Sequence, residues 1–257
     1  MEISSAQVVY SENFNSYSTG TPLVGQGGWS NSPVFFSSSA DVVNGVGINT
    51  TPVAGNSSSS TGTSGAFDSV DFSSAFSGAT GAIFTMDFLR AGTSGATEAR
   101  AGFDVNNSST GFTFGLTAGV MQFRPGVAGG TQLSLFSAPS VTLIATVNQW
   151  YRYTVDIDFS GSASTITSVT VENLTLGTAP VTAYFDSAAT QTSLALGTDE
   201  AAWNRAYVRT GNSSVSADYV DNITLTAIPE PGTAWTLLLG LSIIIPFMYH
   251  RRVKMQS

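Results

Sequence analysis

WYRYTVDIDF, residues 150–159, is the clearest β-strand pattern in the chain. Aromatic and aliphatic side chains fall at every second position, and Arg, Thr and two Asp occupy the positions between them. A period of two is typical of a strand with one face on a core and the other in water. The stretch therefore predicts an antiparallel sheet with one solvated face.

Residues 82–89 show the same alternation, with three large apolar residues set against Thr85 and Asp87. Further strand-like patterns, separated by turn signals such as Pro-Gly and Asn-Asn, lie at residues 8–10, 102–105, 111–116, 120–123, 131–136, 141–147, 165–176, 203–209 and 219–226. The alternation changes phase near Glu172 and Asn173, which indicates a β-bulge there. Roughly ten to fourteen short antiparallel strands without a helix predict an all-β sandwich or jelly roll. We assign this domain to residues 8–227.

The last part of the chain, residues 228–257, reads IPEPGTAWTLLLGLSIIIPFMYHRRVKMQS. Residues 232–249 carry no charge, and as a helix they would rise roughly 27 Å, enough to cross the hydrocarbon core of a bilayer. Arg251, Arg252 and Lys254 follow at once, and such a basic cluster stays in the cytoplasm. We therefore expect a single C-terminal transmembrane helix with the body of the protein outside.

Pro229, Glu230 and Pro231 stand directly before this span. The order of tripeptide, apolar span and basic end resembles the PEP-CTERM sorting signal. The resemblance implies that an exosortase, a membrane-embedded cysteine protease, recognises the tripeptide and cuts nearby. The body would then pass from the inner membrane to the cell surface or the extracellular matrix, and the span would be an anchor used only in transit.

The start of the chain bears on the same expectation. Residues 1–7 have neither a basic start nor an apolar core, but Ser4, Ser5 and Ala6 are similar to the small-residue end of a signal peptide. We therefore interpret residues 1–7 as the remnant of a signal-peptide region. A longer upstream reading frame would support this interpretation.

Three stretches of the body carry a second resemblance: ENFNSYSTGTPLVGQGGW at residues 12–29, QWYRYTVDIDF at residues 149–159 and DYVDNITLTA at residues 218–227. Together they look like the concanavalin A-like, or laminin-G-like, jelly-roll proteins. An acidic-Phe…Gly…Gly-Trp opening and a closing Val-Asp-Asn strand carry the likeness. It implies a sandwich in which the first and last strands lie close together.

Composition excludes several classes of function. The chain has no cysteine, and its only histidine, His250, lies in the tail, so the body has no thiol chemistry, no Ser-His-Asp triad and no His-rich metal site. Before Pro229 there are six arginines, no lysine and sixteen carboxylates, a formal charge of −10. Nucleic acid is therefore not expected as a partner. Nucleotide binding has no support either, because no Gly-rich phosphate loop follows a strand.

Asp221 is the most informative polar residue of the body. On a period-two strand it shares a face with Tyr219, Ile223 and Leu225, which look core-facing, and a buried carboxylate needs a partner. One candidate is Ca²⁺, which takes several oxygen ligands. A salt bridge to an arginine and a strand-end hydrogen bond are the alternatives. The jelly-roll resemblance implies a calcium site where first and last strands meet, with a ligand pool of Glu12, Asp218, Asp221 and Asn222.

Aromatic residues are candidates for sugar stacking. Among the tryptophans of the body, Trp203 is the best candidate, because alternation places it on one face with Arg205 and Arg209. Such a face could hold an acidic polysaccharide. We assign no catalytic residues: Asp156 and Asp158 only superficially match the Glu-x-Asp-x-x-Glu strand of glucanases with this fold, since no Glu flanks them.

These observations favour a non-enzymatic, exported protein of the cell surface or exopolysaccharide matrix that binds glycans weakly. Two alternatives stay open. One is a carbohydrate-active enzyme, hydrolase or lyase, of the same fold. The other is a purely structural envelope protein that binds nothing.

Overall fold

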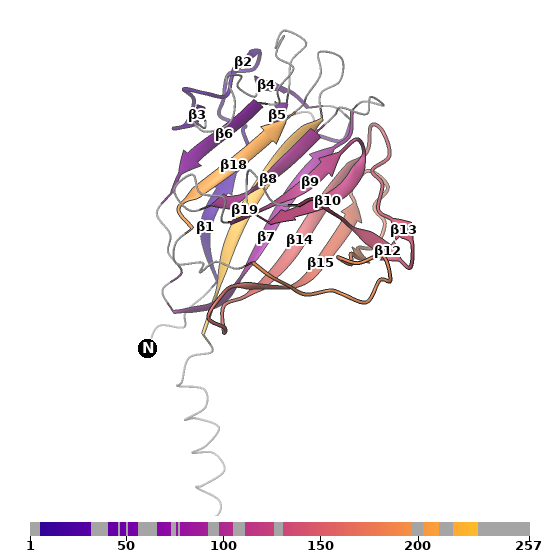
Figure 1. Ribbon diagram of the computed structural model, residues 1–257. Coiled ribbons are helices and arrows are strands. Elements are labelled where there is room, and N and C mark those ends of the chain that lie inside the picture. The colour runs from indigo at the N-terminus through magenta and orange to yellow at the C-terminus, as the bar shows by residue number, and fades with distance from the viewer. Residues whose placement is uncertain are drawn as a thin grey trace, which may run out of the picture.

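The computed structural model describes residues 6–31, 41–45, 47–49, 51–55, 66–72, 76, 78–91, 98–104, 111–125, 131–196, 203–210 and 218–230. These residues form strands and turns, and no helix occurs among them. Two large antiparallel sheets face each other as the layers of a sandwich (Figure 1). The prediction of an all-β antiparallel sandwich is therefore confirmed.

The first layer is a ten-stranded sheet. Its main path runs in the order β16 (Val181–Thr182), β15 (Thr165–Asn173), β14 (Trp150–Asp158), β7 (Ala79–Leu89), β19 (Tyr219–Pro229), β5 (Pro52–Gly55), β4 (Asp41–Asn44) and β2 (Thr21–Pro22). Beside this path, β1 (Gln7–Glu12) pairs with β19, and β17 (Leu194–Ala195) pairs with β15. First and last strands are thus direct neighbours, as the jelly-roll resemblance implies.

The second layer is a seven-stranded sheet. Its order is β11 (Leu133–Ser134), β10 (Val120–Pro125), β9 (Gly111–Thr117), β8 (Glu98–Asp104), β18 (Arg205–Thr210), β6 (Ala66–Asp71) and β3 (Ser30–Asn31). A separate pair, β12 (Phe136–Ala138) and β13 (Val141–Thr142), lies outside both sheets.

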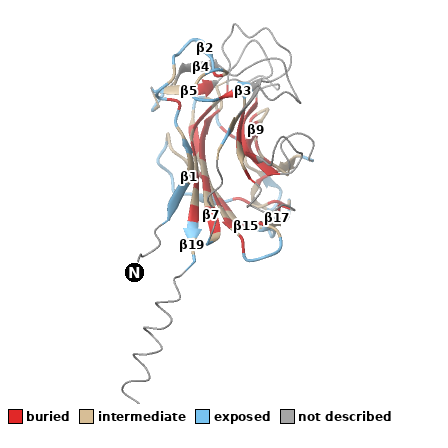
Figure 2. Cartoon of the chain, turned by 90° about the vertical axis from the view of Figure 1, so that its left-hand side faces the viewer, coloured by how far each residue is buried: buried red, intermediate tan, exposed pale blue. Residues whose placement is uncertain are grey.

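Strands β7 and β14 form the centre of the ten-stranded sheet. In their register Met86 faces Tyr153 and Phe84 faces Val155, so the apolar positions of both strands lie on the same side. That side meets the second sheet, and Figure 2 shows buried residues in strands of both layers, such as β7 and β9. The alternation read from residues 150–159 and 82–89 is therefore the inner face of one sheet.

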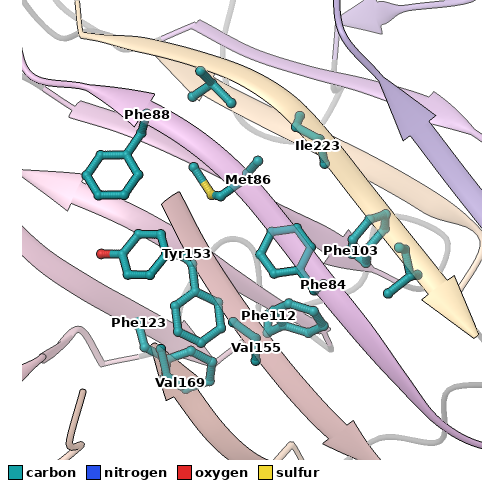
Figure 3. Packing of buried hydrophobic residues seen from close by; sticks show 14 of the residues in the cluster. Phe84, Met86, Phe88, Phe103, Phe112, Phe123, Tyr153, Val155, Val169 and Ile223 are labelled. Carbon is teal, nitrogen blue, oxygen red and sulfur yellow. The ribbon is translucent and has the colours of Figure 1, made fainter. Parts of the chain in front are cut away.

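Aromatic rings fill the space between the layers (Figure 3). Phe84 lies edge-on to Phe103 and to Phe112 of the opposite sheet, with 5.5 Å between ring centroids in each case. The hydroxyl of Tyr153 donates a hydrogen bond to the carbonyl of Gly115 (2.8 Å), so the polar end of this buried ring is satisfied. Edge-to-face contacts add to the apolar burial that holds the two sheets together.

The structure corrects some details of the strand pattern. The bulge predicted near Glu172 and Asn173 is wrong, because both residues pair regularly with β14. The register shifts instead opposite Asp156 and Ile157, where Thr167 is the extra residue. The strands also outnumber the prediction, because pairings of only two residues, such as β16 and β17, are too short to produce a period.

The motif that precedes the apolar tail begins on the sandwich itself. Pro229 is the last residue of β19 and pairs with Ala79, and the amide of Glu230 donates to the carbonyl of Gly78 (2.9 Å). Pro231, the predicted span 232–249 and the basic residues Arg251, Arg252 and Lys254 lie outside the described residues, as do residues 1–5. Within the described ranges no helix has the length and apolarity that a membrane crossing requires.

Replacing Phe84 by Ala tests the aromatic core. We expect Phe84→Ala to lower the free energy of unfolding by about 3–5 kcal/mol, because the cavity forms at a point where rings of both sheets meet. Urea denaturation of residues 6–230 measures the change. Val181→Ala, at an exposed position, is the matched control and should change it by less than about 0.5 kcal/mol. Equal stability of the two variants would contradict this account of the core.

Candidate functional site

Glu12 organises the opening loop of the chain. Its carboxylate accepts hydrogen bonds from the amide of Phe14 (2.8 Å), the hydroxyl of Tyr17 (2.6 Å) and the indole N–H of Trp29 (3.2 Å). Phe14 and Trp29 are buried, and a Cβ on Gly27 would lie 2.1 Å from the Tyr17 hydroxyl oxygen. The acidic-Phe…Gly-Trp pattern is therefore a packing unit in which the Glu12 carboxylate has three donors.

A bulge at Asn222 decides where Asp221 points. Asn222 has a φ of 48°, and the register of β19 against β7 shifts between Asp221 and Thr224. Val220 and Ile223 both lie in the core, which leaves the two residues between them on the other side of the sheet. The prediction that Asp221 shares a face with Ile223 and Leu225 is therefore wrong: Asp221 lies on the outer face, directly opposite Asp87.

The two carboxylates have different partners. Asp87 accepts two hydrogen bonds from Arg152, at 2.7 and 2.8 Å, and a third from the side-chain amide of Asn222 at 2.9 Å. Oδ2 of Asp221 accepts one hydrogen bond, from the side-chain amide of Asn49 (2.5 Å). Oδ1 of Asp221 is buried without a hydrogen-bond partner among the described residues. Burial is the main cause that raises the pKa of Asp221 to about 7, and the nearby carboxylates of Asp87 and Glu12 raise it further.

These residues line a pocket of about 240 Å³ on the outer face of the ten-stranded sheet. Its polar part comes from Asn49, Thr51, Asp87, Asp221 and Asn222, and its apolar part from Ile48, Trp150 and Leu174. Trp150 is itself buried against Val53 and Leu89. Asn49 and Asp87 had no place in the predicted site, because their approach to Asp221 depends on pairing between distant strands.

The predicted calcium pool is only partly assembled. Asp221 and Asn222 lie together at the pocket, whereas Glu12 holds the opening loop and Asp218 accepts a hydrogen bond from the amide of Ala91 (3.0 Å). In the described ranges no three acidic or histidine side chains form a group that could hold a metal ion. Of the alternatives considered from sequence, a hydrogen bond is present at Asp221, while the arginine pairs with Asp87 instead.

The outer face of the seven-stranded sheet carries the second group of polar residues. On β8, Glu98 and Arg100 alternate with Ala99 and Ala101, whose side chains lie in the core. Register places Arg209 of β18 directly opposite Arg100 on one side, and Gly115 of β9 opposite it on the other. Gln122 of β10 continues the same row. The row thus crosses four neighbouring strands.

Arg100 is the centre of this face and is only 3% exposed. Its guanidinium contacts the Glu98 carboxylate (2.6 Å) and donates to the Thr117 hydroxyl (2.6 Å). Arg209 contacts the other Glu98 oxygen at 2.8 Å. The Gln132 amide oxygen, in the orientation that satisfies its neighbours, accepts from Arg124 (3.1 Å) and also from Arg100. We call Glu98, Arg100, Arg124, Arg209 and Gln132 the arginine cluster.

Burial and mutual repulsion act together on the arginines. Burial is the main cause that lowers the pKa of Arg100 to about 10, Glu98 raises it, and Arg124 and Arg209 lower it further. Burial likewise lowers the pKa of Arg124. Both residues remain cationic at neutral pH. In the described part of the chain, Nε of Arg100 and Nε of Arg124 are buried and have no hydrogen-bond partner.

The three predicted glycan contacts are not on one face. Trp203 lies before β18, is fully buried and packs edge-on against Phe76, Phe112 and Phe159. The alternation therefore does not extend back to residue 203, since the strand begins only at Arg205. Arg205 pairs with Asp71, and Arg209 belongs to the arginine cluster.

Replacing Asp221 by Asn should change how stability depends on pH. The folded chain keeps a proton on Asp221 up to about pH 7, whereas the unfolded chain releases it near pH 4, so ionisation costs stability as pH rises between them. In that window Asp221→Asn should remove a fall in the free energy of unfolding of up to about 1.4 kcal/mol per pH unit. Urea denaturation from pH 4 to 8 with a chelator present measures it.

Asp158→Asn is the control for that experiment. Asp158 is only partly buried, and the hydroxyl and amide of Ser160 lower its pKa, so its own contribution to stability is lost only at more acidic pH. If Asp221→Asn leaves the pH profile unchanged, the account of Asp221 as a buried carboxylate with one unsatisfied oxygen is contradicted.

No protein-family model and no curated protein sequence matches this chain. Among solved structures it is similar to the Trypanosoma cruzi calreticulin globular domain, with 8% identity, a TM-score of 0.49, and coverage of 85% of this chain and 88% of that one. A PL-14 alginate lyase from Aplysia kurodai gives 10% identity, a TM-score of 0.48 and coverage of 86% and 99%. Lectin II from Ulex europaeus has 12% identity and a TM-score of 0.47, with coverage of 86% of this chain and 100% of that one. At these values the likenesses carry no conclusion about activity.

Proposed function

We propose that this chain is an exported, non-enzymatic protein of the cell surface or exopolysaccharide matrix that binds glycans on the outer face of the seven-stranded sheet. The observation that carries the proposal is the row that crosses β18, β8, β9 and β10, in which β18, β8 and β10 contribute the hydrogen-bonding side chains of Arg209, Arg100 and Gln122. Their backbones are paired throughout, so the groups stand at fixed spacings. The finer assignment to the concanavalin A-like jelly rolls is part of the same proposal.

The chemistry of the row and of the arginine cluster beside it suits sugars. Gln122 and Gln132 offer amide donors and acceptors, and Arg124 and Arg209 offer several N–H donors from half-buried positions that solvent reaches. Sugar hydroxyls both donate and accept hydrogen bonds. A rigid sheet that presents such groups loses little conformational entropy when a ligand binds.

Export rests on the C-terminal motif. We propose that an exosortase recognises Pro229, Glu230 and Pro231, that residues 232–249 hold the precursor in the inner membrane, and that the body is then transferred to the surface or matrix. Glu230 is exposed and follows the last strand directly, a position that supports recognition by an enzyme at the membrane.

A structural calcium ion remains part of the proposal. Asp221 offers a buried oxygen without a hydrogen-bond partner in the described part of the chain, and carboxylate and amide oxygens are the ligands that Ca²⁺ prefers. Asp221 and Asn222 would hold the ion from the pocket. Glu12 and Asp218 would serve only by giving up the hydrogen bonds they make now.

The enzymatic alternative has weaker support. Asp156 and Asp158 lie on the outer face of the ten-stranded sheet and accept hydrogen bonds from Ser168 and Ser160. They are thus on the opposite sheet from the arginine cluster. Incubation with polysaccharides, followed by assay for new reducing ends or unsaturated uronates, separates a hydrolase or lyase from a binding protein.

Affinity electrophoresis tests glycan binding. Residues 6–230, with calcium in the gel, should be retarded by at least one polysaccharide in a panel of neutral and acidic glycans. Arg124→Ala should weaken the retardation about tenfold, because hydrogen bonds to charged groups are the strong ones in such a site. Thr154→Ala, on the outer face of the other sheet, should leave it unchanged. If no glycan retards the domain, a purely structural role is favoured.

Replacing Glu230 by Ala tests sorting. If an exosortase processes the chain, Glu230→Ala should leave a larger, membrane-retained form of the full-length protein in the native host, because the recognised motif is lost. Fractionation and immunoblotting measure the size and distribution. Thr226→Ala, a half-buried position on the same strand, is the control. Unchanged size and distribution of Glu230→Ala would mean that the span is an ordinary anchor.

A further inference from the structure

We propose that the arginine cluster is an anion subsite that takes the charged group of an acidic sugar, with a uronate carboxylate as the expected ligand. This inference rests on the proposed glycan binding and names the class of glycan. Three observations carry it: the charge balance of the cluster, its unused donors and its rigidity.

The charge of the cluster is not balanced. Among the described residues, Glu98 forms ion pairs with Arg100 and Arg209 and also acts electrostatically on Arg124, so one carboxylate lies among three guanidinium groups. The cluster therefore carries a formal charge of +2 in a body whose formal charge is −10. Cations held close together in a poorly solvated place repel each other, and a bound anion relieves that repulsion.

Two donors of the cluster are unused. Nε of Arg100 and Nε of Arg124 are buried and have no acceptor among the described residues, although other atoms of both groups are hydrogen-bonded. A buried donor without an acceptor costs free energy, and a ligand oxyanion would recover that cost. A neutral sugar hydroxyl would satisfy one donor and leave the excess charge in place.

The central arginine is held in position before any ligand arrives. Its side chain lies over Gly115, where an added Cβ would be only 2.7 Å from Cγ of Arg100. Contacts with Glu98 and Thr117 fix the far end of the side chain. Gly115 therefore makes room for the arginine, and binding does not have to order it.

A carboxylate and a sulfate ester share the chemistry that the cluster selects. Both can present two oxygens to the paired N–H donors of a guanidinium group. The planar carboxylate of a uronate needs fewer additional donors than a sulfate with three terminal oxygens. We therefore expect polyuronates to bind more tightly than sulfated glycans, and both to bind more tightly than neutral glucans.

Affinity electrophoresis and thermal unfolding of residues 6–230 test the subsite together. We expect a polyuronate to bind at least about tenfold more tightly than a neutral glucan, with an affinity that falls as salt rises. Arg124→Gln should abolish that preference. Glu98→Gln removes the internal counter-charge and should instead strengthen polyuronate binding and enlarge the rise in Tm that free glucuronate produces. Glu172→Gln is the same substitution on the other sheet and should change neither.

The outcomes separate this inference from the proposed function. Neutral glucans that bind as tightly as polyuronates would overturn the anion subsite and leave glycan binding intact. If no polysaccharide binds but free glucuronate raises Tm and Arg124→Gln removes that rise, the subsite stands and polysaccharide binding fails. Sulfated glycans that outbind polyuronates would overturn the choice of carboxylate. Should Glu98→Gln not fold, the Arg124→Gln comparison decides alone.

Discussion

Strand β7 is the element on which the rest of the structure depends. It is hydrogen-bonded on both edges, to β14 and to β19, so the middle of the chain and its end are joined through one strand. Of its inward side chains, Phe84 meets rings of the opposite sheet, and Phe88 stacks on Tyr153 of the neighbouring strand β14. Because a strand so paired cannot slip without exposing this face, the register of its neighbours is set as well.

That register also decides the chemistry of the outer face. Asp221 and Asp87 stand directly opposite each other, an arrangement that is unfavourable for two charges. The structure resolves the conflict unequally: Arg152 and Asn222 satisfy Asp87, whereas the pKa of Asp221 rises toward neutrality. The bulge at Asn222 both creates the pair and supplies one of the hydrogen bonds that make it tolerable.

Net charge gives an incomplete picture of what such a domain can bind. The body is acidic overall, which argues against nucleic acid as a partner. Three of its six arginines nevertheless gather on one face around a single glutamate. A local excess of cations is compatible with a negative total, and an anionic ligand responds to the local field at short range.

Period-two alternation in residues 82–89 and 150–159 was enough to establish the all-β class and the inner faces of the central strands, because each pattern is complete within one strand. The apolar tail could likewise be recognised from sequence alone. The candidate sites could not be recognised from sequence alone. Thr167 and Asn222 shift the register without a local sequence signal. Strand β18 begins two residues after Trp203, so the alternation of that strand does not place Trp203, which lies in the core. Glu98 and Arg100 are neighbours on one face of β8, but the approach of Arg124 and Arg209 to them, and of Asn49 to Asp221, depends on hydrogen bonding between different strands, which only the tertiary structure decides.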